Sequence, residues 1–341
     1  MILVTGATGI LGRVIVLELL KRGKTVRATK RKSSNLQEVR KSFQFYTETP
    51  NEYFDSIEWV EVDFEDIHSL QNALIGVEEV YHCAAKVSFH PKDEKKMYQT
   101  NIEGTKQLLF ACQNSSVKKF LYVSSIAVLA GLNENGELDQ SSDFNPKIDH
   151  SAYAISKHLS EMEVWRASAE GLNTVIVNPG LIIGSGNWKE SSGTLFMEFE
   201  KNDYTFSGGT SYVDVRDVAQ ISIELMEKNI FGEHFILVSE SAKYEEIGNS
   251  IRQKLGKSPM KLLPNFVLKV GFYLNLLFGW LFSPLKMANK VNIKSVTEFN
   301  KISNKKIKEK LNYEFIPLEE SLAFHLGNYK KDRSLNGSPK I

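Results

Sequence analysis

Short apolar runs alternate with stretches of helical periodicity over the first half of the chain. Runs rich in β-branched and aromatic residues predict strands, and apolar residues recurring every three or four positions between them predict helices. Such alternation requires parallel pairing with right-handed crossovers, so the predicted fold is α/β with a doubly wound parallel sheet. The predicted strands cover residues 2–5, 24–29, 57–62, 78–83, 118–124 and 173–178, and the helices between them cover residues 10–23, 67–76 and 98–114.

The second half of the chain extends this pattern and then leaves it. Residues 211–215 and 234–238 are expected to add strands to the sheet, with a helix beginning at Arg216 between them. Residues 181–209 and 241–330 break the alternation, and we expect them to form a smaller, mostly helical cap over the carboxyl ends of the strands. The polar residues 331–341 are expected to fray.

A glycine-rich turn, TGATGILG, joins the first predicted strand to the first helix. Its glycines allow unusual backbone angles and close approach to a pyrophosphate, which the free N–H groups of the helix N-terminus also attract. Strand, turn and helix in this order predict a dinucleotide-binding Rossmann domain over residues 1–180 and 210–240; the alternative is a tight turn without a ligand. The predicted contacts are Gly6, Thr8, Gly9, Ile10, Leu11 and Gly12.

Basic residues at the end of the second strand bear on which dinucleotide binds. A Rossmann domain that prefers NAD carries Asp or Glu there, to bind the ribose 2′-hydroxyl. The segment VRATKRKSS has no acid and carries Arg27, Lys30, Arg31 and Lys32, which favour the 2′-phosphate of NADP. The alternative is that these side chains are only solvated, and NAD stays possible.

The third strand ends in VDFED, which supplies Asp63 and Phe64 as further candidates for binding the cofactor. The Asp63 carboxylate is placed to accept a hydrogen bond from the adenine amino group. The alternative is that Asp63 caps the helix that follows.

Composition excludes several classes of protein. The 341 residues are 42% hydrophobic and 24% charged, as in a globular protein, and a net charge of +1 gives no reason to expect nucleic acid as a partner. Cys83 and Cys112 lie far apart and without a histidine cluster, so neither a disulfide framework nor a metal site is predicted. The N-terminus has no signal-peptide pattern, so we expect a cytoplasmic location.

The segment HSAYAISKHLSE, residues 150–161, places Tyr153 and Lys157 four positions apart, which is one helical turn. A free tyrosine has a pKa of about 10, and a nearby ammonium favours the phenolate. The pair is therefore a candidate proton donor and its activator. The alternative is an ordinary surface pair, since two fixed residues recur by chance in many chains.

Eight segments, in this order, resemble the extended short-chain dehydrogenase/reductase family: TGATGILG, VDFED, HCAAKV, TNIEGT, YVSSIAV, YAISK, NPGLIIG and YVDVRDVA. They cover about residues 1–240, and the resemblance fades beyond them. The chain is most similar to the branch that contains dihydroflavonol reductases, cinnamoyl-CoA reductases and hydroxysteroid dehydrogenases. Sugar-nucleotide epimerases and dehydratases are more distant relatives.

The resemblance implies a catalytic set of Tyr153, Lys157 and Ser125. In the family the tyrosine is the general acid and base, the lysine binds the nicotinamide ribose and lowers the tyrosine pKa, and the serine completes the site. Ser124 is the alternative to Ser125, because the register of VSSIAV is uncertain by one residue. Asn101 resembles the asparagine that supports the lysine; its alternative is a polar residue inside a packed helix.

The resemblance also implies how the cofactor is lined. Pro179, followed by Leu181, would form a wall beside the nicotinamide. Asn178 stands where many epimerases carry arginine, which counts against a nucleotide-sugar substrate. Small residues in HCAAKV would let the backbone approach the ribose, and the implied contacts there are Ala84, Ala85 and Lys86.

Together these observations predict an NADP-dependent oxidoreductase that reduces the carbonyl, or oxidises the alcohol, of a small and fairly apolar substrate. The alternative enzyme is a sugar-nucleotide epimerase or dehydratase. The alternative outside enzymology is a non-catalytic dinucleotide-binding regulator. A homodimer is common in the family that the chain resembles.

One apolar segment, LLPNFVLKVGFYLNLLFGWLF at residues 262–282, has Lys269 as its only charge. It lies within residues 251–310, which carry 13 Lys and Arg against two acids, a local net charge of +11. Polar residues interrupt it too often for a membrane span, which takes about 20 apolar residues. We expect a lid helix buried over an apolar pocket. The alternative is weak contact of residues 262–294 with an anionic membrane surface.

Overall fold

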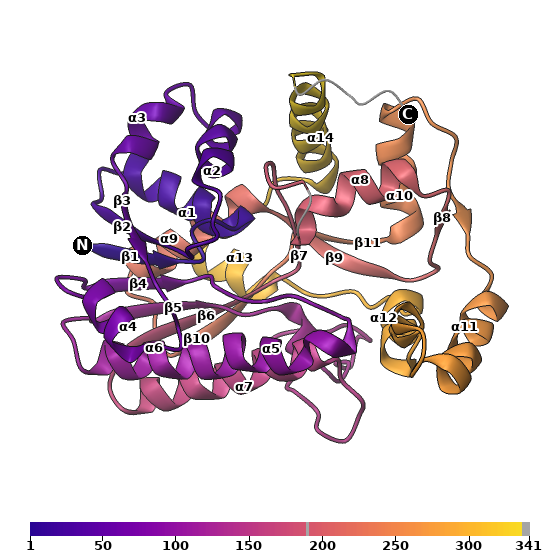
Figure 1. The fold of residues 1–341 in the computed structure, drawn as a ribbon, viewed down its shortest axis with the longest axis horizontal. Coiled ribbons are helices and arrows are strands. Elements are labelled where there is room, and N and C mark those ends of the chain that lie inside the picture. The colour runs from indigo at the N-terminus through magenta and orange to yellow at the C-terminus, as the bar shows by residue number, and fades with distance from the viewer. Residues whose placement is uncertain (189–190, 336–341) are drawn as a thin grey trace.

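The computed structural model describes residues 1–188 and 191–335. A seven-stranded sheet forms one side of the molecule, and its strands are β1 (Ile2–Thr5), β2 (Val26–Lys30), β3 (Glu58–Glu61), β4 (Glu79–His82), β5 (Lys119–Val123), β6 (Asn173–Pro179) and β10 (Glu233–Leu237). All of them run parallel, in the order β10-β6-β5-β4-β1-β2-β3 (Figure 1). The doubly wound parallel sheet predicted from the sequence is confirmed.

Helices cover both faces of this sheet, and they are α1 (Ile10–Lys21), α2 (Leu36–Ser42), α3 (Pro50–Asp55), α4 (Ile67–Ala73), α5 (Glu94–Tyr98), α6 (Gly104–Gln113), α7 (Ala152–Ala169) and α9 (Val215–Glu227). One buried apolar cluster joins α1 and α9 to the sheet, and a second joins α4, α6 and α7 to it. Short 3₁₀ turns lie at Phe43–Phe45, Pro91–Asp93, Ile126–Val128, Ser191–Thr194 and Ser283–Met287, and a π-helical turn lies at Gln99–Glu103.

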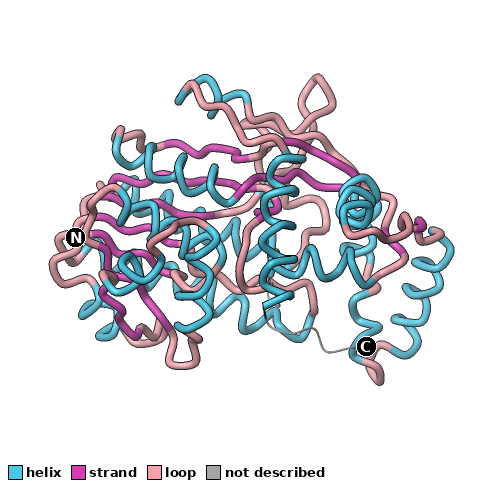
Figure 2. The backbone as a smooth tube through the Cα atoms, turned by 90° about the horizontal axis from the view of Figure 1, so that it is seen from above, coloured by secondary structure: helices cyan, strands magenta, loops and turns pink. Residues whose placement is uncertain are grey.

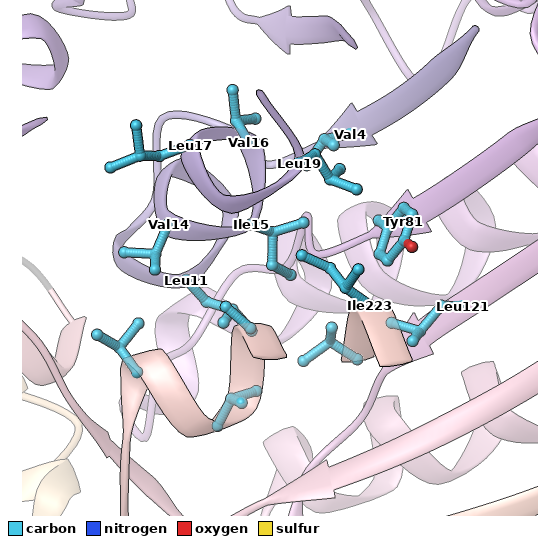
Figure 3. Close-up of a cluster of buried hydrophobic side chains, with 14 of the residues drawn as sticks. Val4, Leu11, Val14, Ile15, Val16, Leu17, Leu19, Tyr81, Leu121 and Ile223 are labelled. Carbon is cyan, nitrogen blue, oxygen red and sulfur yellow. The ribbon is translucent and has the colours of Figure 1, made fainter. Parts of the chain in front are cut away.

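The first helix shows how the layers hold together. The sequence ILGRVIVLELLK is apolar on nearly every side, as expected of a helix that is covered all round. Figure 3 shows Leu11 and Ile15 of α1 in one cluster with Tyr81 and Leu121 of the sheet and Ile223 of α9. Helix α1 is therefore held between the sheet and α9, which fixes the position of the glycine-rich turn at its start.

The glycine-rich turn lies where the strand order reverses. Strand β1 pairs with β2 on one side and with β4 on the other, which opens a crevice at the carboxyl ends of β1 and β4. Gly6 has φ +64°, and a Cβ built on it would lie 2.6 Å from the backbone nitrogen of Ala84. A Cβ on Gly12 would lie 2.3 Å from the carbonyl oxygen of Gly6. Only glycine fits these two positions, because both clashes are with backbone.

The remaining strands form two small sheets: β7 (Leu181–Ile183), β9 (Gly209–Asp214) and β11 (Glu240–Lys243) make one, and β8 (Tyr204–Thr205) and β12 (Lys261–Leu262) make the other. The prediction that residues 211–215 extend the main sheet is therefore wrong, whereas residues 234–238 do join it as β10. The reason is that β10 pairs with β6 at the edge of the main sheet, which leaves no room there for β9. Strand β9 instead passes close to Gly180, on which a Cβ would lie 2.4 Å from the carbonyl oxygen of Ser211.

The remaining helices are α8 (Leu195–Lys201), α10 (Tyr244–Lys254), α11 (Asn265–Phe278), α12 (Lys290–Thr297), α13 (Lys305–Leu311) and α14 (Leu318–Leu335). Figure 1 shows α8, α10, α11 and α12 on the other side of the molecule from the main strands, and Figure 2 shows the same elongated arrangement from above. Helix α13 adds Ile307 and Leu311 to the apolar cluster of the sheet. The expectation that residues 331–341 fray is wrong for 331–335, which continue α14; residues 336–341 lie outside the described part of the chain. The division into a Rossmann domain and a cap stays a prediction.

Helix α11 corrects the prediction of a buried lid. None of its residues is buried, and its apolar side chains face outward instead of covering a pocket. Its contacts are mostly with the 3₁₀ turn Ser283–Met287, which follows it directly in the chain, so no second layer covers it. No helix in residues 1–188 or 191–335 is long and apolar enough to span a membrane.

We expect Gly12→Ala to lower the free energy of unfolding by about 1–3 kcal/mol, because the added methyl group meets the backbone of Gly6 and Ala7. The matched control is Gly327→Ala in α14, where a Cβ meets nothing within 4 Å; it should stabilise the protein by up to about 1 kcal/mol. Urea unfolding of the three proteins tests this. Equal stability of the Gly12→Ala variant and the wild type would show that the turn is looser than described.

Candidate active site

The candidate residues meet at the carboxyl edge of the parallel sheet. Loops that follow β1, β4, β5 and β6 all end there, since parallel strands share one carboxyl edge. Helix α7 crosses the same region and carries Tyr153 and Lys157 in its first turns. Its N-terminus is fixed by Ser151, whose hydroxyl accepts a hydrogen bond from the N–H of Ala154 at 3.1 Å.

Tyr153 lies between a hydroxyl and an aromatic ring. Its phenol is partly buried, and its ring meets the ring of Phe89 edge-on at 6.0 Å between centroids. Burial raises the pKa of Tyr153, while a hydrogen bond from Ser125 lowers it by a smaller amount. The Ser125 oxygen accepts from the N–H of Ala127 at 3.1 Å, so its own proton is available to the phenol.

The register of the two serines follows from these contacts. Ser125 reaches Tyr153, whereas Ser124 is buried at the end of the sheet, where its N–H donates to the carbonyl of Val177 at 2.7 Å. Of the two predicted alternatives, the structure brings Ser125 to the phenol.

Lys157 is 1% exposed, and its amine donates to the carbonyl of Val123 at 2.7 Å and lies 4.2 Å from the ring centroid of Tyr122. Burial lowers the pKa of Lys157 to about 7, against a smaller upward effect of Glu161. The expected lowering of the Tyr153 pKa by Lys157 does not appear in this structure, because burial dominates the pKa of the phenol and Lys157 is itself about half neutral at pH 7.

Glu161 is a functional candidate that the sequence analysis missed, although it stands one turn beyond Lys157 on the same face of α7. It is buried, and its carboxylate accepts from the side-chain amide of Asn178 at 2.7 Å. Burial raises the pKa of Glu161, and the hydrogen bonds and Lys157 lower it. The spacing of four between Tyr153, Lys157 and Glu161 was a signal in the sequence.

Asn101 connects α7 to the loop after β4 and does not contact Lys157 directly. Its side-chain oxygen accepts from the N–H of Lys86 at 2.7 Å, and its amide donates to the Lys86 carbonyl at 3.0 Å and to Ser156 at 2.9 Å. Its carbonyl accepts from the hydroxyls of Thr105 and Ser160 at 2.6 and 2.7 Å. Asn101 lies in the π-helical turn Gln99–Glu103, and such turns are frequent at functional sites.

A buried hydrogen-bonded chain joins Asn101 to the first strand through His82, another residue that the sequence analysis missed. Thr105 donates its proton to Asn101, so its oxygen must accept from Nε2 of His82 at 3.0 Å. Nδ1 of His82 then accepts from Thr5 at 2.6 Å, and Thr5 accepts from the N–H of Ala84 at 3.3 Å. Burial lowers the pKa of His82 to about 3, which fits this neutral tautomer.

Arg13, a buried arginine of α1, binds the glycine-rich turn. In the sequence it is visible only as a charged residue within an apolar helix. Its guanidinium donates to the carbonyls of Thr8 and Gly9 and pairs with both carboxylate oxygens of Glu38 at 2.8 Å. The carbonyls of the turn are therefore occupied. No side chain caps the start of α1, so the N–H groups of its first turn point outward unpaired by side chains.

The turn therefore fits a dinucleotide. Any side chain at Gly6 or Gly12 would fill the space in which the backbone approaches a ligand, and the uncapped N-terminus of α1 attracts phosphate. Thr8 and Gly9 are partly exposed at its surface, whereas Ile10, Leu11 and Gly12 are buried and offer only backbone N–H groups.

The four basic residues after β2 do not act together. Arg27 points away from the turn and binds Glu58 at 2.9 Å and the carbonyls of Ala73 and Ile75 at 2.8 Å. Lys30 lies 3.8 Å from Glu61. Arg31 and Lys32 are exposed, without a side-chain hydrogen bond or ion pair to any described residue. These two are the basic side chains that remain for a 2′-phosphate.

The other predicted cofactor residues line the same edge. Asp63 is exposed after β3 and does not cap α4, because Asp66 is the N-cap residue there. The ring of Phe64 stacks on His82 at 5.8 Å. Ala84, Ala85 and Lys86 follow β4, and Pro179 ends β6 in a buried position, with Leu181 partly buried at the start of β7.

Comparison with known proteins defines the class. The chain belongs to the NAD dependent epimerase/dehydratase family, whose model matches residues 2–237. The resemblance to extended short-chain dehydrogenases/reductases is confirmed, and the protein is an NAD(P)-dependent enzyme of the oxidoreductase or epimerase kind.

Two curated relatives are similar over most of the chain. Sterol demethylase protein B of Methylococcus capsulatus is 30% identical over 248 residues, which is 72% of this chain and 71% of that protein. Dihydroflavonol 4-reductase of Arabidopsis thaliana is 27% identical over 266 residues, which is 74% of this chain and 68% of that protein.

Solved structures share the fold. The crystal structure of gox2253 has a TM-score of 0.80 at 24% identity and covers 98% of both chains. The UDP-glucose 4-epimerase of Thermotoga maritima, solved with UDP-glucose, has a TM-score of 0.76 at 21% identity and covers 97% of this chain and 99% of that chain. Identities this low show the fold alone.

We expect Lys157→Met to stabilise the fold near neutral pH, since it removes a buried amine that is difficult to charge. Burial lowers the pKa of Lys157 from 10.5 to about 7, so between these values the unfolded chain binds more protons than the folded one. Wild-type stability from this group therefore rises with pH across that window, and the advantage of the variant shrinks.

Urea unfolding at several pH values between about 6 and 10 measures this difference. Lys118→Met, an exposed lysine at the opposite edge of the sheet, is the control and should show no such trend. A gap that stays constant or widens as the pH rises would contradict the burial of a neutral lysine.

Proposed function

We propose that this protein is an NADP-dependent oxidoreductase that reduces a carbonyl group, or oxidises the corresponding alcohol, on a small and fairly apolar substrate. The observation that carries the proposal is that Tyr153 and Lys157 lie one turn apart on α7 and that the Lys157 amine bonds to the carbonyl of Val123 at the carboxyl end of β5, two residues before Ser125. A proton donor, an oxygen-binding hydroxyl and a cationic side chain thereby share one site.

The residues divide the work as follows. When bound, NADPH supplies the hydride that adds to the carbonyl carbon. Tyr153 donates its phenolic proton to the carbonyl oxygen, and Ser125 donates a hydrogen bond that holds this oxygen and stabilises its developing charge. Lys157, whose pKa is about 7, exchanges a proton near neutral pH and interacts with the phenolate that Tyr153 leaves. The product is the alcohol.

An apolar substrate agrees with what surrounds the phenol. Phe89 is 48% exposed next to Tyr153 and forms an apolar wall. The segment 180–210 contains no arginine. Two arginines near the cap are already paired with carboxylates of the chain, Arg216 with the buried Asp214 and Arg252 with the exposed Asp203, each at 2.8 Å. The names of the two curated relatives, a sterol demethylase protein and a dihydroflavonol reductase, support a ring-containing apolar substrate class.

The second candidate is a sugar-nucleotide epimerase or dehydratase, favoured by the fold that it shares with such enzymes. Such a substrate carries a diphosphate, which needs cations at the cap. An arginine at position 178 would support this function, but the chain has Asn178 there. This residue is fully buried and bonds to Glu161 and to the carbonyl of Ser125. A non-catalytic regulator is less well supported, because it has no need of Tyr153, Ser125 and Lys157 together.

Steady consumption of NADPH with a panel of apolar ketones and aldehydes tests the first proposal against both others. An epimerase returns its cofactor to the starting state in each turnover, and a regulator consumes none. Absence of NADPH consumption with every member, together with conversion of a nucleotide sugar, would favour the second candidate.

We expect Tyr153→Phe to lower turnover by about a hundredfold or more while leaving the affinity for the cofactor nearly unchanged, because only the transferred proton is lost. Tyr204→Phe, at an exposed tyrosine on β8, is the control and should keep full activity. Turnover numbers and cofactor titration measure the two effects. A Tyr153→Phe variant with most of its activity would refute the assignment of the proton donor.

We expect Arg31→Ala to weaken NADPH binding by about 1.5–3 kcal/mol, since an exposed guanidinium after β2 is available to pair with the 2′-phosphate. Binding of NADH, which lacks this phosphate, should change little. Lys118→Ala at the opposite edge of the sheet is the control. Fluorescence titration of both nucleotides decides the question, and wild-type binding of NADH as tight as NADPH would refute the preference.

A further inference from the structure

Helix α11 and the residues after it carry the most exposed apolar surface in the described part of the chain. Trp280 is 78% exposed, Phe266 66% and Leu277 64%. This surface, which we call the α11 patch, consists of Phe266, Val267, Val270, Tyr273, Leu274, Leu276, Leu277, Phe278, Trp280, Leu281 and Phe282. Monomeric soluble proteins rarely expose a contiguous apolar surface of this kind without a partner for it.

Helix α11 turns its apolar face to solvent and its opposite face to the protein, which is the reverse of the usual arrangement for a surface helix. Leu268, Gly271, Phe272 and Asn275 share one face at helical spacing and are partly covered, and Asn275 donates to the carbonyl of Ala288 at 3.3 Å. The opposite face, which includes Phe266, Val270, Tyr273 and Leu277, is the apolar one and points to solvent. A helix that only packed on the protein would bury that face instead.

Positive charge surrounds the patch. Lys269 lies on α11 itself, and Lys261 and Lys286 lie just before and after it; none of the three forms an ion pair with any described residue. Lys290 and Lys294 of α12 pair only with exposed acids, Asp149 at 3.0 Å and Glu298 at 3.8 Å. Exposed pairs of this kind are weak, so these amines remain available to an anionic partner.

Two further lysines of the basic segment 251–310 lie apart from the patch and bond to other parts of the chain. The amine of Lys254 bonds to Glu319 of α14, and that of Lys257 donates to the carbonyl of Glu200 at 2.8 Å. Both lie at the end of α10, which Figure 1 shows apart from α11.

We propose that the α11 patch binds an anionic lipid surface. Its aliphatic and phenylalanine side chains enter the boundary between headgroups and acyl chains, while Trp280 and Tyr273, with an apolar ring and a polar tip, suit the headgroup level. The lysines around it bind the anionic headgroups. In both views the helix lies at the margin of the molecule away from the main sheet, where a flat surface can reach it (Figures 1 and 2).

A second copy of the chain fits the patch less well. In a twofold symmetric dimer the same patch faces itself, so the lysines around it would meet one another. Residues 251–310 carry a net charge of +11, and this repulsion would oppose the apolar contact. An anionic bilayer complements both the apolar face and its charged surroundings.

The patch is connected to the catalytic site. Nε2 of His90 lies 3.1 Å from the carbonyl oxygen of Ser283, which begins the 3₁₀ turn after α11, and Asn292 of α12 donates to the carbonyl of Phe89 at 3.1 Å. Phe89 in turn meets Tyr153. The segment that binds the lipid surface thus holds the loop that forms the apolar wall of the proposed active site.

The test is co-sedimentation of the whole protein with two kinds of vesicle, one of phosphatidylcholine alone and one containing about a third phosphatidylserine. We expect binding to the anionic vesicles at low salt, weaker binding at high salt, and almost none to pure phosphatidylcholine. Phe278→Ser combined with Trp280→Ser should reduce the affinity about tenfold or more.

The control is Ile75→Ser combined with Phe110→Ser, two comparably exposed apolar residues outside the cap, which should bind as the wild type does. Thermal unfolding of both double variants shows that they are folded. No sedimentation of the wild type with anionic vesicles at low salt overturns the proposal. Sedimentation velocity provides the second check: a dimer that the Phe278→Ser and Trp280→Ser changes convert to monomers, without lipid binding, also overturns it in favour of a second copy.

Discussion

The close approach of β1 and β4 at the reversal point of the sheet is the constraint on which the rest of the site depends. A Cβ on Gly6 would collide with the backbone of Ala84, so the loops after these two strands touch without side chains between them. The contact fixes the start of α1 and the path of the β4 loop together. Through Thr5, His82 and Thr105 it is also continued by hydrogen bonds as far as Asn101. The glycine-rich turn and α7, to which Asn101 bonds at Ser156, are therefore joined by one hydrogen-bonded network.

The burial of ionisable side chains in this network has an electrostatic cost. Lys157 and His82 are both buried with depressed pKa values, and Glu161 is buried with a raised one, so burial disfavours the charged form of each. Removing charged groups from water opposes folding unless they are paired. The result is a lysine that changes its charge near neutral pH, one helical turn from the tyrosine that we propose as the proton donor. A solvated lysine at the same place would remain an ammonium throughout.

The sequence predicted those features that are set locally. The strands of the main sheet, the glycine turn and the face shared by Tyr153 and Lys157 follow from patterns within a few residues. Features that depend on long-range pairing could not be predicted in this way. Strand β9 lies outside the main sheet because β10 occupies the edge of β6. His82, Arg13 and Glu161 each bond to a side chain 17 to 77 positions away in the sequence. The burial of α11 was predicted from its apolar composition alone, and composition does not show whether a second layer exists to cover it.

The residues of the proposed site are held by two different parts of the chain. Tyr153, Ser125 and Lys157 depend on the sheet, whereas Phe89 depends on Asn292 and His90 on Ser283, both contributed by the segment that follows α11. The loop that carries Phe89 and His90 is therefore expected to shift when Asn292 or Ser283 shifts. If α11 binds a lipid surface as proposed, its displacement would reach Phe89 before Tyr153, Ser125 and Lys157, because Phe89 is bonded to that segment and also touches the phenol. In the proposed function, the segment after α11 would therefore affect access of a substrate to Tyr153, while the sheet holds the residues proposed for proton transfer.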